Sequence, residues 1–169
     1  MGPIGMTDAF EIPDELRQFL SLEEGEANLA IATVLVDPEQ KGELISIAAI
    51  AEDEIAKLIV FALAHPDRRG LSEDLMANQM TFHQKIEAFK KVLPEFDSNP
   101  DNYGSHLQFL AALKKLRNTA AHSFGISTAD VLKLKTDSEI VKITANFPGS
   151  AWDKVTALRD YLQPLIPAD

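Results

Sequence analysis

The sequence predicts a mainly α-helical protein, a helical bundle with a small β-hairpin near its C-terminal end. Apolar residues recur at three- and four-residue spacing through most of the chain, which is the period of an amphipathic helix. Between residues 131 and 145 the pattern changes to alternation, which is typical of strands. The 169 residues are enough for one compact core, so we expect a single domain over residues 13–165. Residues 1–12 are expected to be a disordered leader or an expression remnant outside that domain.

The first half of the chain is expected to form three helices. The first covers residues 13–24, because a proline and an aspartate favour its first turn and the following apolar residues share a face. The second covers residues 26–36, whose β-branched end also suits a strand but whose neighbours favour a helix. The third covers residues 39–64. It is apolar nearly all round from Leu44 to Ala51, which indicates a buried central helix that ends at His65-Pro66.

Further helices are predicted after this central helix. A short one covers residues 71–80, and residues 81–93 are strongly amphipathic. Residues 94–104 are rich in proline, asparagine and aspartate, which predicts a loop. Another helix covers residues 105–123, and Gly125 is suited to end it.

The C-terminal part of the chain combines the predicted hairpin with a last helix. The stretches "VLKLK" (131–135) and "EIVKITA" (139–145) alternate with period two, and "TDS" separates them. This pattern predicts a two-stranded hairpin over residues 131–145. Residues 150–165 return to helical spacing, so the chain is expected to end in a helix.

Composition limits the classes of function. The chain has no cysteine, which excludes disulfides and cysteine-based metal sites and favours a cytoplasmic location. The longest apolar stretch, residues 44–51, is too short to span a bilayer, so no membrane partner is expected. The net charge of −10 argues against a large phosphate-binding surface, although a small basic site remains compatible with it.

The residues best suited to chemistry form the segment Arg117-Asn118-Thr119-Ala120-Ala121-His122. On a helix Asn118 and His122 are four residues apart and share a face, and the long side chain of Arg117 can swing towards them. Arginine offers a planar fork of donors to phosphate oxygens. Histidine, with a pKa near ~6.5, can exchange a proton with a ribose 2′-hydroxyl or a leaving oxygen. The segment therefore predicts a phosphodiester site that needs no metal or cofactor.

This Arg-polar-x-x-x-His pattern resembles the signature of HEPN domains, which are up-and-down helical bundles. The order of the preceding helices is similar as well: an apolar helix that runs into acids (44–59), a phenylalanine-led helix (80–93) and then the motif helix. The resemblance extends over about residues 40–125. It implies a metal-independent endoribonuclease that works as a homodimer, with the two motifs facing each other.

The resemblance also implies roles for individual residues. Arg117 and His122 would be the catalytic pair and Asn118 the supporting polar residue. An acid on the central helix would contact the motif, with Asp53 as the first candidate and Glu54 as the second. In such families the activity often serves toxin–antitoxin or anti-phage defence, so RNA and a cognate antitoxin are the implied partners.

Several alternatives are open at this point. The helix order is also similar to the mannitol-operon-repressor group, which implies a non-catalytic regulatory or interaction protein, and nucleotide binding without cleavage is a third possibility. The net charge favours the regulatory alternative, and the intact motif favours the nuclease. A purely structural role is open too, because Arg117 could pair with Asp53 or Glu54 and brace two helices, and His122 is favoured at a helix C-terminus by the helix dipole.

Overall fold

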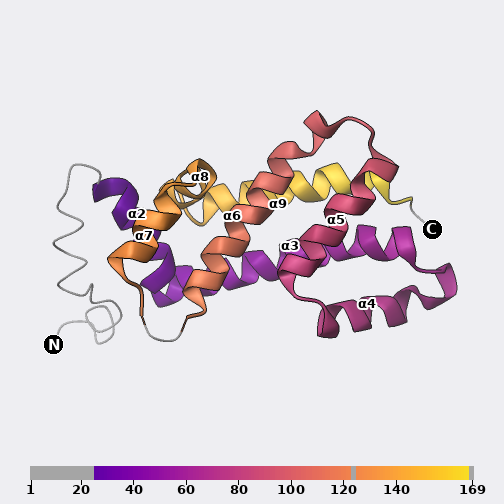
Figure 1. Cartoon of the computed structure of the whole chain (residues 1–169), viewed down its shortest axis with the longest axis horizontal. Coiled ribbons are helices and arrows are strands. Elements are labelled where there is room, and N and C mark those ends of the chain that lie inside the picture. The colour runs from indigo at the N-terminus through magenta and orange to yellow at the C-terminus, as the bar shows by residue number, and fades with distance from the viewer. Residues whose placement is uncertain (1–24, 123–124, 168–169) are drawn as a thin grey trace, which may run out of the picture. The chain divides into compact units, whose positions relative to one another are not determined.

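The computed structural model describes residues 25–122 and 125–167, and all regular structure in these ranges is helical (Figure 1). The predicted helix over residues 13–24 and the predicted leader lie outside the described residues. The mainly helical fold class is confirmed. The described ranges hold eight α-helices: α2 (Gly25–Val36), α3 (Pro38–Leu63), α4 (Arg69–Gln79), α5 (Phe82–Phe96), α6 (Gly104–Ala120), α7 (Thr128–Lys135), α8 (Ser138–Ala145) and α9 (Gly149–Leu162).

The described residues form two compact units. The first unit holds the described part of Met1–Ser46 together with Lys115–Ala151, and the second holds Ile47–Lys114 and the described residues from Trp152 onwards. Helices α3, α6 and α9 contribute residues to both units. No helix in the described ranges is long and apolar enough to cross a membrane.

In the first unit, α2 packs against α7 and α8 (Figure 1). One apolar side of each short helix is removed from water, and burial of this kind is the main source of stability for helices of such length. The buried apolar side chains of these helices are Ile31, Ala32, Val34 and Leu35 of α2, Val131 and Leu134 of α7, and Ile140 and Ile143 of α8.

The predicted hairpin over residues 131–145 is wrong, because this stretch forms α7 and α8. Ser127 and Asp130 make a capping box: the Asp130 N–H donates to the Ser127 hydroxyl (3.2 Å) and the Ser127 N–H donates to the Asp130 carboxylate (3.0 Å). The segment "TDS" is the junction between the helices and not a hairpin turn, since Asp137 is the N-cap of α8. Val131 and Leu134, three residues apart, are both buried while Leu132 is 48% exposed, which fits a helix better than the alternation that the sequence suggested.

The second unit has its core among α3, α5, α6 and α9. The predicted buried helix is confirmed for its central part, where Ile47, Ala51, Ile55 and Leu58 are fully buried. At its end Leu63 is 72% exposed, so the helix is not covered all round. The larger buried apolar residues of the other helices are Phe82, Ile86, Phe89, Val92 and Leu93 of α5, Phe109, Leu110 and Leu113 of α6, and Val155, Leu158 and Leu162 of α9.

Helix α5 begins where the sequence predicted and ends later. The Thr81 hydroxyl accepts the Gln84 N–H (3.1 Å), and the Gln84 side chain accepts the Thr81 N–H (2.8 Å), so the two residues form a capping box. The predicted loop at residues 94–104 begins too early, because α5 continues through Pro94 to Phe96. A proline in the last turn removes only one backbone hydrogen bond, and the buried side of α5 outweighs that loss.

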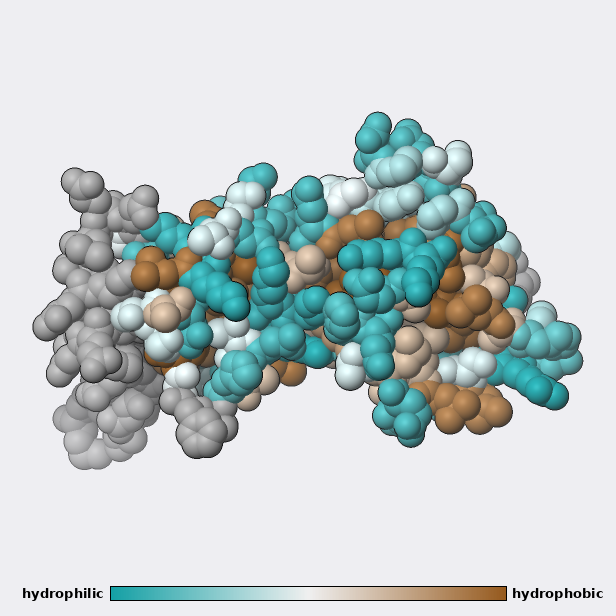
Figure 2. All heavy atoms as spheres, viewed as in Figure 1, coloured by the Kyte–Doolittle hydropathy of each residue, from teal (hydrophilic) through white to brown (hydrophobic). Residues whose placement is uncertain are grey.

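Helix α4 differs from the others because none of its residues is buried. Leu71 is 60% and Leu75 54% exposed, and Figure 2 shows hydrophobic surface over this helix. At its first residue the Arg69 guanidinium lies over the Phe61 ring, 4.5 Å from the ring centroid. This cation–π contact connects the start of α4 to the end of α3.

A largely buried ion pair connects α3 to α5. Lys85 Nζ lies 2.7 Å from Glu52 Oε2, and the two side chains are only 6% and 18% exposed. Taking two charges out of water is costly, so such a pair depends on both members being present. Removing one leaves the other poorly solvated.

Replacing Lys85 by methionine is expected to lower the free energy of unfolding by about 3 kcal/mol, because Glu52 then loses its buried partner. Urea denaturation followed by circular dichroism measures the change. Lys90→Met is the matched control on the same helix. Lys90 is 44% exposed in its ion pair with Glu87, so the control should change stability little. Equal losses in the two variants would contradict a special role for the buried pair.

Candidate functional site

The predicted motif lies at the C-terminal end of α6. The Ala121 N–H donates to the Arg117 carbonyl oxygen (2.9 Å), as in an α-helix. The His122 N–H instead donates to the Thr119 carbonyl oxygen (3.2 Å), three residues back. The last turn is thus tightened, which is common where a helix ends. His122 stands just beyond the helix and its side chain is exposed.

A pocket of about 400 Å³ opens beside this helix end, within the first unit. Three of its residues lie on α6 and a fourth just beyond it; the last three follow the first by three, four and seven residues, which places all four on one side of the helix end. The other wall comes from α7 and the residue after it. The lining residues are Lys115, Asn118, Thr119 and His122 on one side and Asp130, Lys133, Leu134 and Thr136 on the other.

The structure brings together only part of the predicted motif. Asn118 and His122 both line the pocket, as their four-residue spacing predicts. Arg117 is not a lining residue, because one helical step turns its Cα about 100° away from Asn118. Its side chain is partly buried.

The predicted acids belong to the second unit. Asp53 is exposed, and Glu54 is only 8% exposed. The Glu54 carboxylate accepts hydrogen bonds from Arg159 Nε (3.1 Å) and Lys57 Nζ (3.3 Å), both in the same unit. A contact of Asp53 or Glu54 with the motif stays a prediction.

Charge is distributed unevenly along the chain. Residues 115–137 carry four of the 16 lysines and arginines but only two of the 26 acids. The chain is therefore locally basic around the pocket although its net charge is −10. Electrostatic attraction of exposed charges extends over about 8 Å at physiological ionic strength, so this local balance matters more to a bound group than the total.

Asp137 holds one of the pocket lysines. Its carboxylate accepts a hydrogen bond from Lys115 Nζ (2.9 Å) and another from the Glu139 N–H (3.0 Å). Burial raises the pKa of the Asp137 carboxyl, but the hydrogen bonds from Lys115 and the backbone, with the charge of Lys115, outweigh burial and keep the pKa below its ordinary value. The ionised carboxylate fixes the ammonium group at the edge of the pocket.

The hydroxyl groups of the pocket donate to the helices themselves. The Thr119 hydroxyl donates to the Lys115 carbonyl oxygen (2.9 Å), and the Thr136 hydroxyl donates to the Lys133 carbonyl oxygen (2.6 Å). Their oxygens keep lone pairs, so towards a ligand they act as acceptors. The donors available to an anion are the ammonium groups, the Asn118 amide and the imidazole of His122.

The positive charge of residues 113–117, which include Lys115, was apparent beside the motif, but sequence reasoning missed Thr119, Asp130, Lys133 and Thr136 as residues of this site. A signal for the α6 side was present, since positions 115, 118, 119 and 122 fall on one helical face. The α7 side could not be found while residues 131–135 were interpreted as a strand. In the ranges that the structure describes, no three histidine, aspartate or glutamate side chains are grouped closely enough to hold a metal ion.

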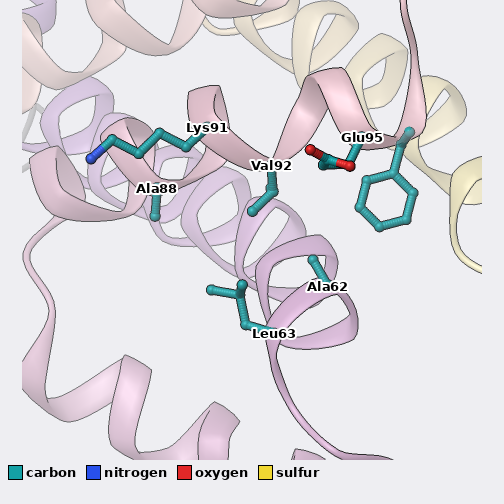
Figure 3. A pocket seen from close by; sticks show the side chains of 7 residues that line it. Ala62, Leu63, Ala88, Lys91, Val92 and Glu95 are labelled. Atoms are coloured by element: carbon teal, nitrogen blue, oxygen red, sulfur yellow. The ribbon is translucent and has the colours of Figure 1, made fainter.

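A second pocket, of about 540 Å³, lies between α3 and α5 in the second unit. Figure 3 shows Ala62 and Leu63 of α3 facing Val92 of α5 across it. Lys91 and Glu95 are its charged lining residues, and Ala88 and Phe96 complete the lining. Apolar groups dominate this pocket, so it offers less than the α6–α7 pocket for acid–base chemistry on a phosphate.

Comparisons of the chain with protein-family models, curated proteins and solved structures find no match. The fold and the site by themselves define a mainly helical protein with an open, locally basic pocket at the end of α6.

Replacing Asp137 by asparagine is expected to lower the free energy of unfolding by about 0.5–1 kcal/mol at pH 7, because asparagine can still cap α8 but cannot pair with Lys115. The lowered pKa of Asp137 sets the sign of the pH dependence. Its ionised form stabilises the fold above about pH 4, and this contribution is lost as the pH falls through the folded-state pKa. The difference between native chain and variant should therefore shrink in urea titrations from pH 5 to pH 3. A difference that stays constant over this range would argue against the ion pair.

Proposed function

We propose that this chain is a HEPN-like, metal-independent endoribonuclease that cleaves RNA by attack of a 2′-hydroxyl on the adjacent phosphate. The observation that carries the proposal is the pocket in which His122 and Asn118 meet Lys115 and Lys133. A histidine beside groups that bind phosphate oxygens is the arrangement that such cleavage requires. The motif Arg117-Asn118-x-x-x-His122 supports it as well.

In the proposed reaction His122 takes the proton of the ribose 2′-hydroxyl. The 2′-oxygen then bonds to phosphorus, and the bond from phosphorus to the 5′-oxygen breaks. The products are a 2′,3′-cyclic phosphate and a 5′-hydroxyl, whose proton comes from an acid on the other side. His122 of a second copy of the chain would supply that proton in a homodimer.

The remaining predicted residues have supporting roles in this proposal. Arg117 would reach round from the neighbouring face of α6 and neutralise the charge that develops on the phosphate. Asn118 would donate from its amide to a phosphate oxygen. Asp53 or Glu54 would orient Arg117. A cytoplasmic role in a toxin–antitoxin or defence system, with a cognate antitoxin as partner, is the biological setting that the HEPN-like motif favours.

The second candidate is a non-catalytic HEPN-like regulatory or interaction protein, similar to the mannitol-operon-repressor group. Two observations favour it. The net charge of −10 opposes RNA binding over a wide surface. Leu63 lines the pocket of Figure 3 and is exposed, and Leu71 and Leu75 expose apolar area on α4; exposed apolar patches often mark interaction surfaces.

Cleavage of mixed single-stranded RNAs in the presence of EDTA tests the proposal. We expect the native chain to leave 2′,3′-cyclic or 3′-phosphate ends, and His122→Ala to lose at least about 100-fold in rate because general acid–base catalysis typically contributes that much. Arg117→Ala should lose activity as well. His83→Ala is the control, since His83 is exposed in the second unit and does not line the pocket.

The opposite result has a clear meaning. If folded native chain leaves all RNAs intact, or if the His122→Ala preparation cleaves as fast as the native one, the nuclease proposal fails. The regulatory candidate then becomes the better account of the motif.

A further inference from the structure

We infer that the pocket between α6 and α7 binds one nucleotide of single-stranded RNA, with Lys115 and Lys133 holding its phosphate and the oxygens of Thr119 and Thr136 accepting a ribose hydroxyl. The inference extends the proposed function, and only the cleavage step depends on that proposal. It adds α7 to a site that the motif on α6 had suggested, and it assigns a substrate class.

Lys133 is the key residue on the α7 side. It lines the pocket opposite Lys115, Asn118 and His122. Among the described residues its side chain has no ion pair or hydrogen bond. An exposed ammonium in a pocket lining, with no carboxylate within ion-pair distance, is available to an anion. Lys115 Nζ donates a hydrogen bond to Asp137, but an ammonium group has three N–H donors, so Lys115 can contact a phosphate as well.

Two carboxylates oppose an anion here, Asp130 in the lining and Asp137 at the pocket edge beside Lys115. Asp130 also lines the pocket, but its Oδ2 accepts the Ser127 N–H (3.0 Å) in the capping box. That hydrogen bond and the N-terminal end of α7 both stabilise its negative charge locally. Because Asp137 already pairs with Lys115, Lys133 is the lining cation that remains for a phosphate, with the Asn118 amide and the His122 imidazole as further polar groups of the lining.

The two threonines give the pocket a preference for ribose. Both hydroxyl protons are used by the Lys115 and Lys133 carbonyl oxygens, so the threonine oxygens can only accept. A phosphodiester has no proton to offer them. A ribose hydroxyl does, and the 2′-hydroxyl is the group that distinguishes RNA from DNA.

The size and charge of the site indicate a single strand. A volume of about 400 Å³ lies in the range of pockets for small ligands and suits one nucleotide. Duplex RNA is bound instead through backbone contacts spread over successive grooves, which need many basic residues along a surface. A chain with net charge −10 and only four basic residues between positions 115 and 137 does not provide such a surface.

Fluorescence anisotropy with a labelled ten-nucleotide RNA tests the inference, in a His122→Ala background and with EDTA so that the RNA stays intact. The RNA, the DNA of the same sequence and the RNA duplex are compared at several salt concentrations. We expect binding in the order single-stranded RNA, then DNA, then duplex. Lys133→Ala should weaken RNA binding about tenfold and flatten the slope of log affinity against log salt by about 0.7, the loss of one phosphate contact.

The matched control is Lys142→Ala, which removes the same charge from an exposed position on α8 in the same unit. It should change neither the affinity nor the slope. Thr136→Val should reduce the preference for RNA over DNA and leave DNA binding unchanged. Circular dichroism melting curves confirm that each variant is folded.

Three results would overturn the inference: no binding of single-stranded RNA, equal effects of Lys133→Ala and Lys142→Ala, or a duplex bound as tightly as the single strand. These outcomes can be distinguished from a failure of the nuclease proposal. RNA cleavage by the native chain with binding insensitive to Lys133 would retain the nuclease and reject the pocket. RNA binding that depends on Lys133, without cleavage by the native chain, would retain the pocket and reject the nuclease.

Discussion

The hydrogen bonds of the Asp137 carboxylate connect the fold of the first unit to its pocket. One oxygen accepts the Glu139 N–H and starts α8, and the other accepts Lys115 Nζ from the end of α6. The same group therefore caps α8, which packs against α2, and holds a cation at the pocket edge. Burial raises the pKa of the Asp137 carboxyl, and the hydrogen bonds and the charge of Lys115 lower it by more. Fold and candidate site share this one side chain.

Most helices could be predicted from the sequence because their apolar spacing is unambiguous, as in α5, where Phe82, Ile86, Phe89 and Leu93 are all buried. The predicted hairpin over residues 131–145 was wrong for a physical reason. "VLKLK" satisfies both a period of two and a helical spacing, and over so few residues the two patterns cannot be told apart. The capping residues Ser127 and Asp137 mark the starts of two helices, and in short segments such caps are a more specific signal than alternation.

The candidate site was predictable only where one helix contains it. Four-residue spacing placed Asn118 and His122 together, and the structure agrees. Lys133 lies 11 residues beyond His122, on another helix, and no local pattern connects the two. Arg117 shows the opposite limitation, since the motif groups it with His122 in sequence while the helical pitch turns it to the neighbouring face. A short motif records which residues occur together and not which surface they share.

The lack of buried residues in α4 has a consequence for local unfolding of the second unit. An 11-residue helix without a buried residue gains little from tertiary packing, and isolated helices of this length are marginal in water. The contact of Arg69 with Phe61 secures its first turn, whereas Leu71 and Leu75 remain in contact with solvent. Its backbone amides should exchange with deuterium long before those of α5, and a protease should cut there first. The second unit thus contains a segment that unfolds locally while its core stays intact.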